Sequence, residues 1–145
     1  MSVYLDSSLL CKLYLYEPET PRVARWVQSQ GQSVGFNSLH ELEFLNSIQL
    51  HVFRKTLSQE HAATLQKNIE DDLAAGVLVR APLEWNLVFA EAVRLNGLFS
   101  RKLGSRSLDI LHVAGAVVSG CDRFATHDEK QAALAKAAGL KLLQV

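Results

Sequence analysis

Short apolar runs alternate along the chain with longer segments in which hydrophobic residues recur at helical spacing. Runs of strand length lie at residues 3–5, 33–36, 77–80, 123–126 and 141–143. Strands that alternate with helical segments predict an α/β protein with a parallel sheet and helices on both faces. The first strand is expected to be the central one, because its continuous apolar character is typical of a strand buried on both faces.

The segments between these runs are predicted to be helices, whose ends are marked by capping residues and glycines. Asn37 or Ser38 is a candidate N-cap for the third helix, and Gly139 is an expected stop. The polar and basic residues 100–106 are predicted to form a loop. Helices are expected up to Tyr16, around Val23–Val27, and over residues 39–55, 58–75, 84–99, 108–118 and 128–138.

The segment from Leu108 to Val118 is apolar on every side except at Asp109, which predicts a buried helix that carries one acid. A carboxylate is rarely buried without a partner or a metal ion. Asp109 is therefore a candidate functional residue at the mouth of a cleft. The alternative is a structural role, in an ion pair with Arg106 or a hydrogen bond to His112.

Two further acids directly follow predicted strands, Asp6 after the first and Asp128 after the fourth. Ligands of open parallel sheets collect beyond the carboxyl ends of the strands. Carboxylates that converge at such an edge repel one another unless a cation screens them. Ligation by oxygen alone, without a cluster of Cys or His, favours Mg²⁺ or Mn²⁺ over zinc. Taken alone, Asp6 is better explained as a helix N-cap, and Asp128 as a cap of the last helix or as a solvated residue of the His-Asp-Glu-Lys run.

The third helix carries two glutamates, Glu41 and Glu43, on different stripes. Glu43 shares its stripe with Asn46, whereas Glu41 shares one with apolar residues. Periodicity does not choose between the two, and a solvated helix face explains either one alone.

Composition narrows the class of protein. The chain has 145 residues, 48% of them hydrophobic, which favours one domain with a single core. Its 15 basic and 15 acidic residues cancel, so binding of nucleic acid must depend on a local patch. Two cysteines do not make a disulfide framework, and no apolar run approaches the ~20 residues of a membrane span. A cytoplasmic protein without membrane contact is expected.

Four segments, YLDSSLLCKLY, SLHELEFLNSI, SLDILHVAGA and FATHDEKQAALAKAAGL, resemble the PIN-domain ribonucleases, and most closely the VapC-type toxins of type II toxin–antitoxin systems. The resemblance covers nearly the whole chain. It implies a three-layer α/β/α sandwich with parallel strands in the order 3-2-1-4-5. It also implies that the catalytic, metal-binding acids are Asp6, Glu43, Asp109 and Asp128. Glu43 is preferred to Glu41 because Asn46 follows it by three residues.

The implied activity is an endoribonuclease in which Mg²⁺, with Mn²⁺ as a possible substitute, activates water to cleave RNA phosphodiester bonds. The implied partners are the RNA substrate, a cognate antitoxin protein and a second copy in a homodimer. Arg101, Lys102 and Arg106 are candidates to contact RNA phosphates, and a solvated basic loop is the alternative.

The competing function is a PIN-like protein-binding module with little or no nuclease activity. The full set of acids argues against it, because a purely structural module has no reason to crowd carboxylates. A haloacid-dehalogenase-like phosphatase would need a second Asp where the chain has Ser8. A response-regulator receiver would need an Asp at the end of the third strand, where the chain reads Val-Arg-Ala-Pro.

Overall fold

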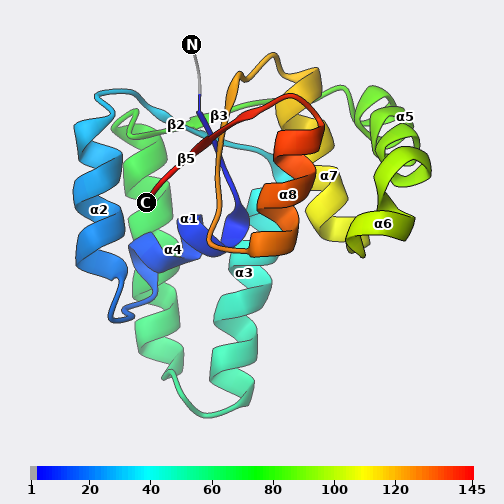
Figure 1. The fold of residues 1–145 in the computed structure, drawn as a ribbon. Helices are drawn as coiled ribbons and strands as arrows, with labels where there is room; N and C mark the ends of the chain where they lie inside the picture. The colour runs from blue at the N-terminus through cyan, green and yellow to red at the C-terminus, as the bar shows by residue number, and fades with distance from the viewer. Residues whose placement is uncertain (1–2) are drawn as a thin grey trace. The chain divides into compact units, whose positions relative to one another are not determined.

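The structure, a computed structural model, describes residues 3–145 as an α/β protein in which every paired strand is parallel (Figure 1). The chain packs as two compact units. The first unit contains the chain up to Asp6 and Pro82–Val145, and the second contains Ser7–Ala81. The α/β class with parallel strands is confirmed, whereas the organisation as one domain stays a prediction.

The first unit contains a three-stranded ladder in the order β1-β4-β5. Its strands are β1 (Val3–Leu5), β4 (Arg123–Ala125) and β5 (Lys141–Leu143), close to the three runs predicted there. The ladder continues one residue past β1, because the Asp6 backbone N–H donates to the Ala125 carbonyl at 3.0 Å. The backbone of Asp6 is therefore fixed at the carboxyl end of two neighbouring strands.

Five helical segments belong to the same unit (Figure 1). The predicted loop over residues 100–106 is wrong in its first part, because the helix before it continues as a π-helical turn and one further α-turn. Arg101, Lys102 and Leu103 are good helix formers, and the chain turns only at Gly104, whose φ of 68° favours glycine. The segments are α5 (Trp85–Leu95), η1 (Asn96–Ser100), α6 (Arg101–Leu103), α7 (Ser107–Val118) and α8 (Glu129–Ala137).

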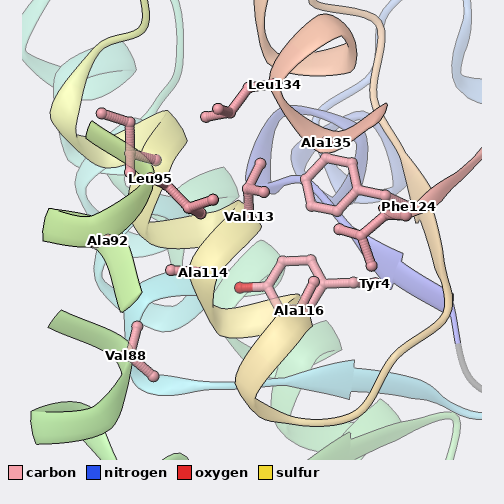
Figure 2. Packing of buried hydrophobic residues seen from close by; sticks show 12 residues of the cluster. Tyr4, Val88, Ala92, Leu95, Val113, Ala114, Ala116, Phe124, Leu134 and Ala135 are labelled. Atoms are coloured by element: carbon pink, nitrogen blue, oxygen red, sulfur yellow. The ribbon is translucent and has the colours of Figure 1, made fainter. Parts of the chain in front are cut away.

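The core of this unit lies between the ladder and α5, α7 and α8. Figure 2 shows the Tyr4 ring beside Phe124, with its hydroxyl turned toward α7. The two rings stack with their centroids 5.5 Å apart, and the Tyr4 hydroxyl hydrogen-bonds to His112 Nδ1 at 2.8 Å. The predicted burial of α7 is confirmed at Ile110 and from His112 to Ala116, whereas Leu111 is only half-buried. It fails at Leu108, which is 50% exposed because the first turn of α7 lies at the surface.

The second unit contains a two-stranded ladder, β2 with β3, and four helices. Asn37, one of the two predicted candidates, is the N-cap of the third helix. Its side chain accepts hydrogen bonds from the backbone N–H groups of Leu39 and His40, and the His40 side chain accepts one from the Asn37 backbone N–H. The elements are α1 (Ser7–Tyr14), α2 (Thr20–Ser29), β2 (Val34–Phe36), α3 (Ser38–Phe53), α4 (Gln59–Ala74) and β3 (Leu78–Arg80).

The predicted strand order 3-2-1-4-5 agrees with both ladders, since they contain the runs 3-2 and 1-4-5. Each ladder lies within one of the two units. Within residues 3–145, no helix has both the length and the apolar character needed to cross a membrane.

Candidate functional site

Asp6 directly follows β1 and is buried, with 6% of its surface exposed. Its backbone is fixed by the bond to β4, and its Oδ1 accepts a hydrogen bond from Gln131 Nε2 at 3.0 Å. A buried carboxylate that is held at both backbone and side chain has a defined orientation. The local reason is the apolar β1 run, which places the next residue at the edge of the sheet.

Asp109 lies in the first turn of α7, and its pKa is raised above the ordinary value. The largest cause is burial, which disfavours the charged form. Arg106 acts in the opposite direction, with its Nε donating to Asp109 Oδ2 at 3.2 Å. The negative charges of Asp6 and Asp128 raise the pKa further. Asp6 and Asp128 are therefore close enough to Asp109 for their charges to act on it.

The structural alternative for Asp109 is partly realised, since it pairs with Arg106. The other alternative predicted a hydrogen bond between Asp109 and His112. His112 Nδ1 instead meets the Tyr4 hydroxyl, and the histidine is almost fully buried. This agrees with a packing role for His112.

Asp128 is the N-cap of α8, as its structural alternative proposed. Its Oδ1 accepts from the Gln131 backbone N–H at 2.8 Å, and its own N–H donates to Thr126 Oγ1 at 3.0 Å. The cap uses only one carboxylate oxygen. The other, Oδ2, lies 3.9 Å from Arg106 Nη2. Asp128 can therefore cap α8 through Oδ1 and have a functional role through Oδ2.

A cleft of about 500 Å³ contains Asp109 and Asp128 in its wall. Of the three predicted phosphate-contacting residues only Arg106 lines it; Arg101 and Lys102 lie exposed on α6 and are not part of its wall. The lining residues are Gly104, Ser105, Arg106, Asp109, His127, Asp128, Glu129, Lys130 and Gln131.

Among the lining residues that the sequence did not single out, two bear on the chemistry of the site. Lys130 adds a second cation, and Gln131 contacts the acids directly. Their position could have indicated a role at the site, because both residues fall in the first turn of a helix that begins at the end of a predicted strand. In the sequence they look like the polar face of an ordinary surface helix.

The two glutamates of α3 have different partners within the second unit. Ser7 Oγ donates to Glu43 Oε1 at 2.9 Å, and Ser7 is the residue that follows Asp6 in the chain. Glu41 instead pairs with Arg80 of β3. An ion pair gives Glu41 a structural explanation, whereas Glu43 accepts a hydrogen bond from the hydroxyl of Ser7.

The donor chemistry of these acids fits a hard cation such as Mg²⁺, because every candidate ligand is a carboxylate oxygen. The raised pKa of Asp109 beside Asp6 and Asp128 is the electrostatic sign of a site that attracts positive charge. Arg106 supplies such a charge here. Within residues 3–145, however, no three or more His, Cys, Asp or Glu side chains are grouped closely enough to form a complete ligand set.

Comparison with known proteins gives a likeness of fold. FitAcB from Neisseria gonorrhoeae matches with a TM-score of 0.72 and 18% sequence identity, over 99% of this chain and 97% of that chain. No family model matches the chain, and no curated protein matches it. The chain thus has a PIN-like α/β fold, as expected.

The assignment to the PIN-domain ribonuclease family, and within it to the VapC-type toxins, is wrong. The absence of a family match and the likeness to FitAcB at 18% identity overturn it, since that level of identity carries the fold alone. The four segments are short, and each contributes one candidate acid to an α/β pattern of strands and helices. Because one fold can host many unrelated functions, such segments do not identify a family.

Proposed function

We propose that this protein is a Mg²⁺-dependent endoribonuclease of PIN-like fold that acts in the cytoplasm. The observation that supports the proposal best is the convergence of three acids at the edge of the sheet: Asp109 and Asp128 line one cleft, and Gln131, which also lines it, contacts Asp6, Asp109 and Asp128. Functional sites are where such costly arrangements of charge gather. The fit of these oxygen donors to a hard cation supports the choice of metal.

In this proposal Asp6, Asp109 and Asp128 bind the ion, with Glu43 as the fourth acid and Mn²⁺ as a possible substitute. When bound, Mg²⁺ would supply a more acidic water and neutralise charge on the phosphodiester. The chain's own residues orient that chemistry. Glu43 is retained because its carboxyl is held by Ser7, the residue next to Asp6.

Arg106 and Lys130 are proposed to receive the RNA backbone. Both line the cleft that contains Asp109 and Asp128, and an RNA phosphate needs positive charge to approach a group of carboxylates. The Arg106 side chain is 78% exposed, so its ion pairs contribute little to stability. It can therefore turn from Asp109 to a phosphate at small cost. Arg101 and Lys102 are proposed only to contact phosphates farther along the RNA.

The likeness to FitAcB supports a PIN-like toxin, and we extend the proposal to an antitoxin protein as partner and to a homodimer. An antitoxin would have to cover the cleft or bind beside it to suppress cleavage. The likeness of fold supports both partners, and size-exclusion chromatography with light scattering tests the homodimer.

The test is cleavage of a mixed RNA pool by the purified protein, freed of any copurified partner by denaturation and refolding. We expect cleavage with Mg²⁺, none with EDTA, and none from Asp6→Asn or Asp109→Asn. Glu43→Gln and Glu41→Gln form a matched pair in one helix. Loss of activity in Glu43→Gln but not in Glu41→Gln would support Glu43 as the fourth acid, since Glu41 already pairs with Arg80.

A protein-binding module is the second candidate. An exposed apolar surface favours it: Phe89 and Val93 of α5 border a groove of about 320 Å³ that is also lined by Ile110 and Leu111 of α7. If the refolded wild type and the acid variants are equally inert with Mg²⁺, the nuclease proposal fails and this function takes its place.

A further inference from the structure

Gln131, in the first turn of α8, contacts the three predicted site acids of the first unit, Asp6, Asp109 and Asp128. It is 1% exposed. Its Nε2 donates to Asp6 Oδ1 at 3.0 Å and approaches the Asp109 carbonyl oxygen at 3.5 Å, while its backbone N–H donates to Asp128 Oδ1 at 2.8 Å. Its Oε1 accepts from the Thr126 hydroxyl at 2.7 Å. A single buried side chain therefore joins the ends of β1 and β4 to the first turns of α7 and α8.

The amide of Gln131 can adopt only one orientation in this network. A carboxylate accepts hydrogen bonds and cannot donate them, so the nitrogen must face Asp6. With the nitrogen on Asp6, Oε1 faces the Thr126 hydroxyl, which accepts from the Asp128 N–H and donates to Oε1. A flipped amide would place oxygen against the Asp6 carboxylate and lose the bond from Thr126.

We propose that Gln131 is a positioning residue that holds the Asp6 carboxylate in the orientation in which it binds a divalent cation. The inference rests on the proposed metal-dependent function. A neutral donor suits this task. Lys or Arg at the same place would hold Asp6 at least as firmly, but its charge would cancel part of the negative potential that attracts the ion. Hydrogen-bond partners of metal ligands orient those ligands in this way.

The side chain of Gln131 can be tested apart from the helix cap. The cap on α8 uses the backbone N–H of Gln131 and the side chain of Asp128. Gln131→Met keeps that backbone group, the length of the side chain and its preference for helix, and removes only the amide. Thr126→Val removes the hydroxyl that orients the amide, whereas Thr126→Ser keeps it.

The experiment measures Mn²⁺ binding to the full chain by the loss of the free Mn²⁺ signal in electron paramagnetic resonance. Gln131→Met is expected to raise the Kd by about 10-fold or more, the usual effect of removing a partner of a metal ligand. Thr126→Val should raise the Kd in the same direction, and Thr126→Ser should leave it unchanged. Gln66→Met, the same replacement in α4, is the matched control and should also leave it unchanged.

Thermal unfolding of each metal-free variant checks that it is folded, and if Gln131→Met does not fold, Thr126→Val carries the test. A Kd in the folded variants equal to that of the wild type overturns the positioning role while leaving the metal-dependent function intact. Failure of the wild type to bind Mn²⁺ overturns both. A crystal structure of metal-free Gln131→Met gives a readout without any ion: we expect the Asp6 side chain to change its rotamer, and an unchanged Asp6 would contradict the role.

Discussion

Arg106 and Asp109 form an ion pair across the start of α7, with Nε donating to Oδ2 at 3.2 Å. The same guanidinium lies 3.9 Å from the Asp128 carboxylate through Nη2. One exposed cation thus stands beside two of the three acids whose charges interact. Its weak hold on them suits a residue that exchanges partners when substrate arrives.

The first prediction concerns this arginine. Arg106→Gln should raise the KM for RNA about fivefold, which corresponds to the ~1 kcal/mol upper end for an exposed charge pair, and should leave kcat nearly unchanged. Steady-state cleavage of a fluorescent RNA measures both constants. Arg101→Gln on α6 is the control, with a smaller effect, because Arg101 is not in the wall of the cleft. A fall in kcat with constant KM would contradict a role in binding phosphate.

Asp109→Asn should make the metal-free protein more stable at neutral pH. Burial, together with the charges of Asp6 and Asp128, raises the pKa of Asp109 despite Arg106. The native state therefore holds this proton more tightly than the unfolded state, whose pKa is near 3.8. The contribution of Asp109 to the free energy of unfolding falls as pH rises from about 3.8 through the raised native value, and stays low above it.

Urea unfolding of wild type and Asp109→Asn across this pH range measures that contribution. The advantage of the variant should be greatest at neutral pH and should shrink as the pH falls below 3.8, where both states are protonated. An equal difference in stability at every pH would show that the charge of Asp109 is not its cause.

Tyr4→Phe should destabilise the protein by about 1–3 kcal/mol, the usual cost of removing one partner of a buried hydrogen bond. The lost hydroxyl is the one that meets His112 Nδ1 at 2.8 Å. Stacking on Phe124 is retained, so the change isolates the hydrogen bond. Tyr16→Phe is the control, because Tyr16 is 85% exposed and its replacement should change nothing measurable in urea unfolding. Equal effects of the two replacements would contradict the prediction.

Gly115→Ala should also destabilise, by about 1–3 kcal/mol for overpacking, despite the gain in helix propensity. A Cβ at this position would lie 3.3 Å from both Tyr4 Oη and Leu83 Cδ1. Tyr4 cannot easily retreat, since it is stacked on one side and hydrogen-bonded on the other. At Gly97 a Cβ would meet nothing within 4 Å, so Gly97→Ala should not destabilise. Calorimetric melting of both variants tests the contrast.

Local signals in the sequence were enough to predict most elements of the fold. The strands at residues 3–5 and 141–143 match β1 and β5, and Asn37 caps α3 as one of two candidates. These features depend on residues within one turn or one strand of each other, so the sequence contains them directly. The predicted loop at 100–106 failed for the same kind of reason, because Arg101 and Lys102 are polar yet favour helix.

The acids of the candidate site could be proposed from the sequence, because an acid after a buried strand or inside an apolar helix is costly without a purpose, and their role stays a prediction. The family assignment failed, since no family model matches the chain and a likeness at 18% identity shows the fold alone. Periodicity alone also left Glu41 and Glu43 equivalent. The structure separates them by their partners, Arg80 for one and Ser7 for the other.

The sequence by itself thus determined the order of strands and helices, most of their ends and the acids worth testing. Only the tertiary structure decided what each acid contacts. The partner of Asp6 is Gln131, 125 residues away in the chain, and Gln131 looks in the sequence like one more polar residue on a surface helix. Capping and periodicity are short-range properties of the chain, whereas the charge and orientation of a buried carboxylate depend on which distant segments fold against it.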